Sequence, residues 1–246
     1  KDMQILVTGL SVTSTGNEAQ TTARIRGVGT VGDNPGLESS VGVVIDGVYR
    51  SRNSVGFGDL GDVERIEVLK GPQGTLFGKN TSSGIINVIT RKPAFERSAE
   101  GELTVGNLGT LGFAGAYNDT PGENSAFRIY ATHRERDGLL DVVTGAGPRE
   151  SEEDVTQDFN SVRAQFLLQP NDGFEINFIA DTTERDERCC SAVTIVRGPT
   201  SAIVNALAGG SGVIDAAAPS RRLAFSNDDT RQEVEDRGIS AEAVWQ

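Results

Sequence analysis

Hydrophobic and polar positions follow two different patterns along the chain, and the pattern changes near Pro93. Before this point, the runs VGVVIDG and IINVIT are almost continuously apolar, are rich in β-branched residues and lie between glycine-rich turns. Continuous apolar runs of this length are typical of strands that are buried on both faces. The first part of the chain is therefore predicted to be a small compact domain with short strands.

After Pro93, apolar residues alternate with polar or small ones. Six segments show this alternation, at residues 98–105, 111–117, 127–132, 161–168, 174–181 and 239–246. A period of two is typical of a strand with one apolar face and one polar face. Because no helix of comparable length is predicted between the segments, an antiparallel meander is the simplest way to connect them.

One apolar face and one charged face suit either a soluble sandwich or a barrel with lipid outside and water inside. The spacers after the second and fourth segments are short, and those after the third and fifth are long. Short turns at one end and long extracellular loops at the other are typical of outer-membrane barrels. Aromatic residues near the short-turn end fit an interfacial girdle, namely Tyr117, Phe127, Phe174 and Trp245. These features favour the barrel, with the soluble sandwich as the alternative.

Six strands are too few for a closed barrel of the size required. A barrel that encloses a separate domain needs roughly 22 strands, and an open sheet would leave two unpaired edges in lipid. The alternating pattern also continues to Gln246. We therefore expect the chain to be a fragment of a larger barrel protein.

Charge and length limit the kinds of partner. The 246 residues carry a formal net charge of -12, which argues against a nucleic-acid partner, because such proteins gather Lys and Arg on one face. No run of eighteen apolar residues is present, so a transmembrane helix is excluded, whereas a transmembrane strand needs only about ten alternating residues. Contact with outer-membrane lipid is therefore compatible with the sequence through strands alone.

The last long spacer contains the two cysteines, Cys189 and Cys190. Adjacent Cα atoms lie about 3.8 Å apart, which is too close for an unstrained disulfide, so a strained vicinal bridge and two free thiols both stay open. With His133 as the single histidine, there are too few ligands for a structural zinc site. No metal site and no cofactor are predicted. The segment TSAIVNALAGG in the same spacer predicts a short helix that could cover a pore mouth.

Two glycine-rich segments partly match the patterns of nucleotide-binding loops. Gly27, Gly29 and Gly32 fit GxGxxG, but the preceding TTARIR is polar and Pro35 interrupts the segment where a helix is required. GPQGTLFGKNT has Asn80 in place of the hydroxyl that binds magnesium in a phosphate-binding loop. The chain also lacks a GxSxG turn and a Ser, His and Asp set around its single histidine. The sequence therefore predicts no enzyme.

Three motifs in the first part of the chain resemble the plug domain of TonB-dependent outer-membrane receptors. They are IRGVGT, VGVVIDGVY and DVERIEVLKGPQGTLFGKNTSSGIINVITRKP. The resemblance covers about residues 10–93, with the motifs in order. It implies an α+β plug domain at residues 1–95, with its N-terminus missing. It also implies antiparallel transmembrane β-barrel strands at residues 96–246, the first roughly six strands of a truncated 22-stranded barrel.

The resemblance also implies a function and a compartment. Such receptors import scarce nutrients, such as a ferric siderophore, cobalamin, haem or an oligosaccharide, across the cell outer membrane of a Gram-negative bacterium. The implied partners are the TonB complex, through an N-terminal box that is missing here, an extracellular small ligand such as a metal chelate, and outer-membrane lipid. The alternative is a passive porin-like or adhesive β-protein without energy coupling.

Two sets of candidate site residues follow from the same resemblance. Candidates for ligand contact, in two extracellular plug loops, are Gly32, Asp33, Asn34, Tyr49, Arg50, Ser51, Arg52 and Asn53. The arginines among them could attract an anionic chelate through their planar fork, although solvated loop arginines are the alternative. Candidates for contact between plug and barrel are Arg26, Glu64, Arg65, Glu67 and Lys70. These charges are expected to pair with wall residues missing from this chain, or else to be solvated.

Overall fold

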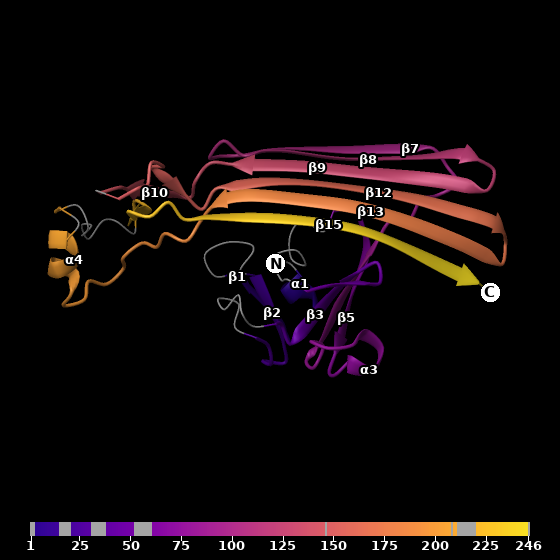
Figure 1. Cartoon of the computed structure of the whole chain (residues 1–246), viewed down its shortest axis with the longest axis horizontal. Coiled ribbons are helices and arrows are strands. Elements are labelled where there is room, and N and C mark those ends of the chain that lie inside the picture. The colour runs from indigo at the N-terminus through magenta and orange to yellow at the C-terminus, as the bar shows by residue number, and fades with distance from the viewer. Residues whose placement is uncertain are drawn as a thin grey trace.

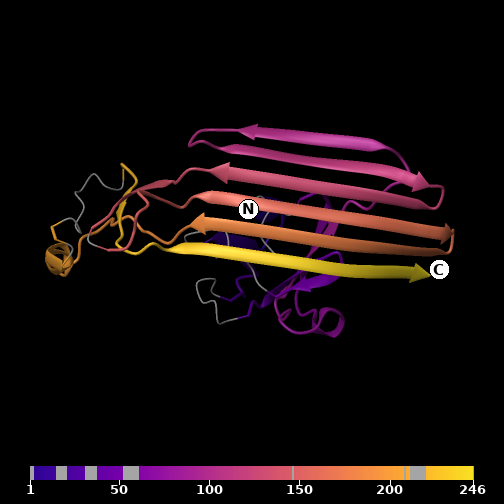
Figure 2. The same cartoon turned by 45° about the horizontal axis from the view of Figure 1, so that its top comes forward.

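The computed structural model consists of an N-terminal domain that lies against one face of a long six-stranded sheet (Figures 1 and 2). It describes residues 3–14, 21–30, 38–51, 61–145, 147–207, 209–210 and 220–245. None of the helices in this part of the chain has the length and apolar character that a membrane span requires.

The N-terminal domain contains a two-stranded and a four-stranded sheet. Its elements are α1 (Met3–Leu6), β1 (Leu10–Ser14), β2 (Thr21–Ile25), β3 (Val41–Ile45), β4 (Val48–Arg50), β5 (Val63–Lys70), α3 (Gly74–Phe77) and β6 (Gly84–Thr90). The four-stranded sheet has the order β4-β3-β6-β5, and β3 runs parallel to β6. The two apolar runs of the sequence are thus its two central strands.

The core of this domain forms where the central strands meet the β1–β2 hairpin. Every residue of β3 is buried, and Ile25, Ile86 and Val88 pack in the same cluster. A central strand covered on both faces has no solvated side, which explains why its sequence does not alternate.

The six alternating segments form one antiparallel sheet, which we call the wall. Its strands are β7 (Ser98–Val105), β8 (Leu111–Gly122), β9 (Ser125–Arg136), β12 (Gln157–Asn171), β13 (Phe174–Arg188) and β15 (Arg231–Trp245). They follow the order β15-β13-β12-β9-β8-β7. Several strands are longer than their alternating segments. For example, β15 begins at Arg231 and not at 239. Residues 231–238 are mostly polar, so they show no alternation between hydrophobic and polar positions that would predict a strand.

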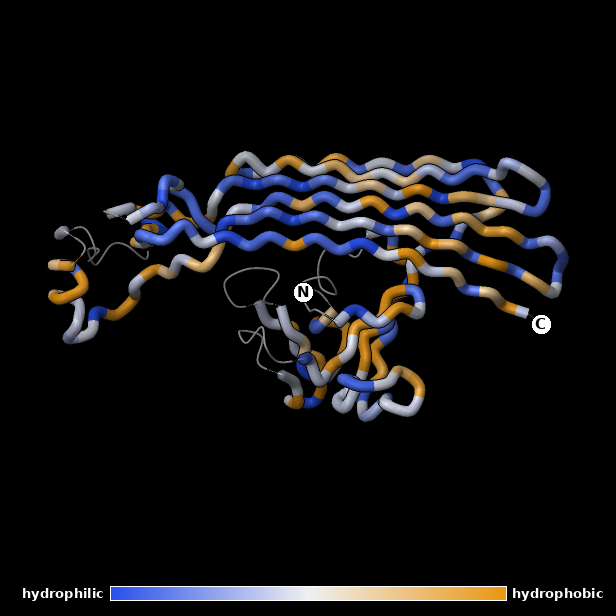
Figure 3. Tube along the Cα trace, viewed as in Figure 1, coloured by the Kyte–Doolittle hydropathy of each residue, from blue (hydrophilic) through white to orange (hydrophobic). Residues whose placement is uncertain are grey.

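Along the wall strands, hydrophobic residues are more frequent toward the short-turn end and hydrophilic residues toward the other end (Figure 3). Near the short turns, Phe166 lies opposite both Phe127 and Phe178. At the other end, outward positions carry carboxylates, including the opposed pair Glu135 and Asp158. An apolar band with a charged continuation fits strands that extend from lipid into water.

The long loops fold beyond the polar end of the wall. Their elements are β10 (Leu140–Val143), β11 (Glu153–Asp154), α4 (Ser201–Leu207) and β14 (Leu223–Phe225). Helix α4 lies within the predicted TSAIVNALAGG segment, far out along the loop (Figure 1). Cys189 and Cys190 form a vicinal disulfide, which selects one of the two states that the sequence left open.

Candidate functional site

The strand ends of the N-terminal domain carry charged side chains. These side chains contact the face of the wall that points toward the domain, which we call the inner face. The first contact is at the turn between β3 and β4, where Asp46 and Gly47 both have positive φ, as Asp-Gly hairpins require. The Asp46 carboxylate accepts hydrogen bonds from the backbone N–H (2.9 Å) and the hydroxyl (2.8 Å) of Thr90. It also accepts a hydrogen bond from Arg163 of β12, at 2.6 Å. One carboxylate therefore connects two strand ends of the domain to the wall.

The second contact involves Arg50, the last residue of β4. Its Nη2 lies 3.0 Å from a carboxylate oxygen of Asp181 on β13, and its Nη1 lies 2.7 Å from Asp236 on β15. The Arg50 side chain is only 9% exposed. Gly238 provides the space, because a Cβ at this position would lie 3.3 Å from Arg50 Nη1. Arg50 therefore bridges two adjacent wall strands.

The third contact joins Asp62, just before β5, to Arg128 on β9. Arg128 donates from Nε to one carboxylate oxygen of Asp62 and from Nη2 to the other, the second at 3.0 Å. The side chains are 7% and 8% exposed. Arg91 and Glu100 lie at the edge of this pair, within 3.7 Å. Two parallel N–H···O bonds of this kind fix orientation as well as charge.

Neutral hydrogen bonds continue the interface between the ion pairs. Gln165 donates from Nε2 to the Thr90 hydroxyl at 2.9 Å and to the Arg91 carbonyl at 3.0 Å. Its own carbonyl accepts a hydrogen bond from Asn177 at 3.2 Å. These contacts are all polar, so this part of the interface can open without exposing an apolar core. While it is closed, every buried charge depends on its partner.

Asn118 of β8 holds the segment that connects the domain to the wall. Its side chain is fully buried. It accepts a hydrogen bond from the Ala94 N–H at 2.9 Å and donates to the carbonyls of Ala94 (2.8 Å) and Glu96. The side-chain amide of Asn118 thus makes the backbone hydrogen bonds that a neighbouring strand would otherwise make with the connecting segment.

We expect Asn118→Ala to increase hydrogen exchange of the Ala94 amide about tenfold or more, because unsatisfied buried groups cost about 1–3 kcal/mol. The measurement is amide exchange in the folded receptor followed by mass spectrometry. Asn107→Ala, the same change at an exposed turn position, serves as the control and should leave the rate unaltered. An unchanged Ala94 rate in the Asn118 variant would show that the anchor is not needed.

The predicted candidates for contact between plug and barrel pair with one another or with neighbouring residues of the N-terminal domain. Arg65 pairs with Glu64 and Glu67 on its own strand, and Lys70 donates to the Thr8 carbonyl at 2.6 Å. Arg26 lies in an exposed turn. Their proposed pairing with wall residues outside this chain stays a prediction.

The exposed carboxylate of Glu67 has an environment that favours its charged form. Hydrogen bonds from Arg65 and then from Asn87 lower the pKa of Glu67, and the bond to Glu67 raises the pKa of Arg65. A carboxylate with a lowered folded-state pKa keeps its contacts until the pH falls through that lowered value. This pair is therefore insensitive to pH near neutrality.

Of the predicted ligand contacts, the structure describes three. Ser51 is exposed, and Tyr49 is half-buried. Arg50 forms ion pairs with Asp181 and Asp236, and its contact with an anionic chelate stays a prediction. The others lie outside the described residues, namely Gly32, Asp33, Asn34, Arg52 and Asn53.

Sequence reasoning missed the residues that join the two layers, although a signal was present. Arg128 and Arg163 stand on the polar face of alternating strands, Arg128 as the fourth residue of β9 and Arg163 near the middle of β12. Charges in a transmembrane strand point to the lumen because lipid excludes them. A search for acidic partners at the strand ends of the first domain would have included Asp46 and Asp62.

Comparison with known proteins agrees with this two-layer arrangement. Residues 2–85 match the family model of the TonB-dependent Receptor Plug Domain. The pesticin receptor of Yersinia pestis is 41% identical over 88 residues, which are 35% of this chain and 12% of the receptor. The ferrioxamine receptor of Yersinia enterocolitica is 34% identical over 79 residues, 32% of this chain and 11% of the receptor. The chain thus spans about an eighth of these relatives.

Among solved structures, the ferric yersiniabactin uptake receptor FyuA from Yersinia pestis superposes with a TM-score of 0.70 at 19% identity. The match covers 98% of this chain and 34% of FyuA, so the fold extends over both the N-terminal domain and the wall. TonB-dependent receptors are proteins of the Gram-negative outer membrane, and this is the compartment of the chain. Residues 2–85 thus belong to the plug-domain family of TonB-dependent receptors, and the antiparallel strands that follow have the fold of the barrel wall of such a receptor.

Proposed function

We propose that the protein is an active transporter of the outer membrane, which imports a scarce nutrient with energy from the TonB complex. The observation that supports this most directly is the polar interface between plug and wall. Buried ion pairs such as Asp62 with Arg128 hold the plug in a defined position. Water entering the lumen can solvate both charges when they separate, whereas an apolar interface would oppose separation.

We propose a ferric siderophore as the ligand class. The names of the similar proteins support this, since they are receptors for ferrioxamine, for catecholate siderophores and for ferric yersiniabactin. Cobalamin, haem and oligosaccharides are the other nutrients considered. The proposal includes no enzymatic step and no resident cofactor, and the partners are the TonB complex, the extracellular chelate and outer-membrane lipid.

Uptake measurements test this proposal. A strain that lacks the gene and its complemented counterpart would receive radioactive iron bound to ferrioxamine, yersiniabactin, enterobactin or pyoverdine. We expect gene-dependent accumulation with at least one chelate, and its loss when TonB is removed or a protonophore is added.

The other outcomes distinguish the alternatives. Accumulation that persists without TonB would support a passive porin-like protein and contradict energy coupling. Gene-dependent uptake of none of the four chelates would contradict the siderophore class.

A further inference from the structure

The two long loops at the polar end of the wall form one folded body. We call this body the loop cap, and define it as the described parts of residues 140–156 and 189–230. In its three-stranded sheet, β10 pairs with β11 of the same loop and, in parallel, with β14 of the other loop. Val142 and Ala224 are buried between them. The loops are therefore joined by backbone pairing and by a small apolar core.

A buried ion pair stabilises this body. Arg149 Nη2 lies 3.2 Å from Asp154, and both side chains are fully buried. Arg149 also donates to the carbonyls of Ser151 (2.8 Å), Glu153 (2.7 Å) and, across the loops, Asp228 (3.1 Å). A fully buried ion pair is stable only when nearly all of its hydrogen-bonding groups have partners, because an unpaired charge away from water costs several kcal/mol.

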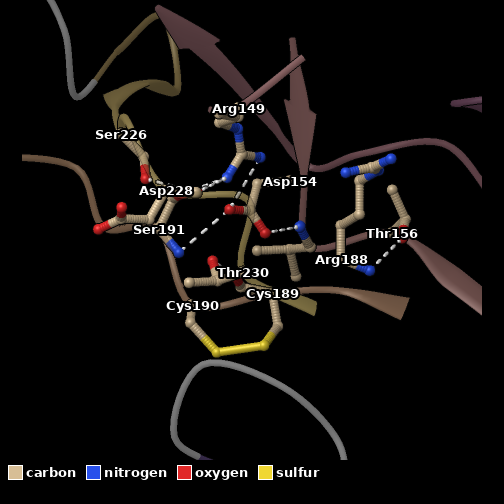
Figure 4. The surroundings of a disulfide bond; sticks show 11 residues. Arg149, Asp154, Thr156, Arg188, Cys189, Cys190, Ser191, Ser226, Asp228 and Thr230 are labelled. Carbon is tan, nitrogen blue, oxygen red and sulfur yellow. Dashed lines mark hydrogen bonds and ion pairs between the residues drawn. A yellow bond between two sulfur atoms is a disulfide. The ribbon is translucent and has the colours of Figure 1, made fainter. Parts of the chain in front are cut away.

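The vicinal disulfide lies where β13 leaves the wall and enters the loop cap (Figure 4). Just before it, the Arg188 N–H donates to the Thr156 hydroxyl at 2.9 Å. The Cys189 N–H donates to the Thr230 carbonyl at 3.2 Å. Just after it, the Ser191 N–H donates to Asp154 at 3.1 Å. The two cysteines thus lie between the end of the wall strand β13 at Arg188 and the contact of Ser191 with the buried carboxylate.

Cys190 has a φ of 85°, in the left-handed region that residues with a Cβ rarely adopt. A residue keeps such a conformation only where its surroundings impose it. The ring that joins the two adjacent side chains supplies a covalent constraint here. It holds the turn that directs the Ser191 N–H toward Asp154.

We propose that the Cys189–Cys190 disulfide is a redox-sensitive clasp that keeps the two loops together as one cap. An external dithiol breaks the S–S bond by supplying two electrons and two protons. Two cysteine thiols form, and the dithiol becomes a disulfide. The turn at Cys190 then relaxes, the Ser191 bond to Asp154 is lost, and the loop cap loosens while the wall and the plug stay folded.

Hydrogen exchange in the full-length receptor in outer-membrane vesicles tests this inference. The probes are the amides of Ser191, Asp141 and Ser226, whose hydrogen bonds hold the cap. After reduction with dithiothreitol, verified by thiol labelling, we expect their exchange to rise roughly tenfold or more. The Phe166 amide in wall strand β12, toward the short turns, should be unaffected. Equal cap exchange before and after verified reduction would overturn the proposal.

Two variants separate the clasp from a general effect of the reagent. The double variant Cys189→Ser, Cys190→Ser should show fast cap exchange in the absence of reductant and no response to it. Slow exchange in this variant would contradict the clasp. Asp154→Asn should loosen the cap in both redox states, because it weakens the Arg149 pair directly and leaves the disulfide in place. A cap that stays closed in oxidised Asp154→Asn would contradict the role of this carboxylate.

Discussion

The variant Asp62→Asn should release the plug at a much lower urea concentration than the native receptor. The change removes the charge that faces Arg128, and both side chains are less than 10% exposed. Loss of one partner of a buried pair costs about 3 kcal/mol, because the remaining charge stays desolvated. With a urea dependence of about 1–3 kcal/mol per molar, the midpoint should fall by about 1–3 M.

Conductance across a planar bilayer is the suitable measurement, since the pore opens when the plug unfolds or leaves. Arg65→Gln is the matched control. It removes one charge from an ion pair on the same domain, but its side chain is 53% exposed, and exposed pairs contribute about 1 kcal/mol or less. The exchange of charges in Asp62→Arg with Arg128→Asp should recover part of the loss. Equal midpoints for the Asp62→Asn and Arg65→Gln variants would contradict a structural role for the buried pair.

Gly84→Ala should prevent the plug from folding while the barrel still forms. Gly84 begins β6 at a φ of 141°, and a Cβ there would lie 2.3 Å from the Leu69 carbonyl oxygen and 2.8 Å from Ile25. The Ile25 side chain can move, but the Leu69 carbonyl belongs to the backbone of the adjacent strand β5. Backbone strain and this contact together should exceed about 4 kcal/mol, which is a large share of a small domain's stability.

Two readouts separate plug folding from barrel folding in this variant. Faster migration of the unboiled protein on electrophoresis should persist, because it reports the closed barrel. The pore should conduct without urea, because the plug no longer fills it. Gly74→Ala is the matched control, since the nearest atom to its Cβ would be 4.0 Å away, and it should behave as the native protein. A closed pore in the Gly84 variant would show that β5 and β6 can separate enough to admit the methyl group.

The two variants address different parts of the proposed transport cycle. Asp62 lies at the boundary between plug and wall, where weaker binding should ease displacement of a folded plug. Gly84 lies inside the plug, where the substitution should remove the closed state altogether. Faster uptake in Asp62→Asn would indicate easier release of a folded plug. Loss of uptake in Gly84→Ala would indicate that unfolding of the plug abolishes transport.

Local sequence determined the faces of the wall strands and part of the length of each strand. Alternation from residue 98 onward assigned Phe166 to the outer face and Arg163 to the inner face, because successive side chains in a strand point to opposite sides. Continuous apolar runs likewise marked β3 and β6 as central. Both are properties of a few neighbouring residues, so the sequence carries them without knowledge of the rest of the fold.

Only the tertiary structure decided which charges meet and which strand ends contact the wall. Arg50 and Asp236 are 186 positions apart in the sequence, and Asp62 and Arg128 are 66 apart. Their pairing depends on how the plug is seated against the wall, which no local pattern encodes. The parallel pairing of β10 with β14 likewise joins two loops that are far apart in the sequence. The sequence by itself determined the apolar part of each wall strand and the face that each side chain occupies, whereas contacts between distant segments required the folded chain, because they depend on where whole elements pack.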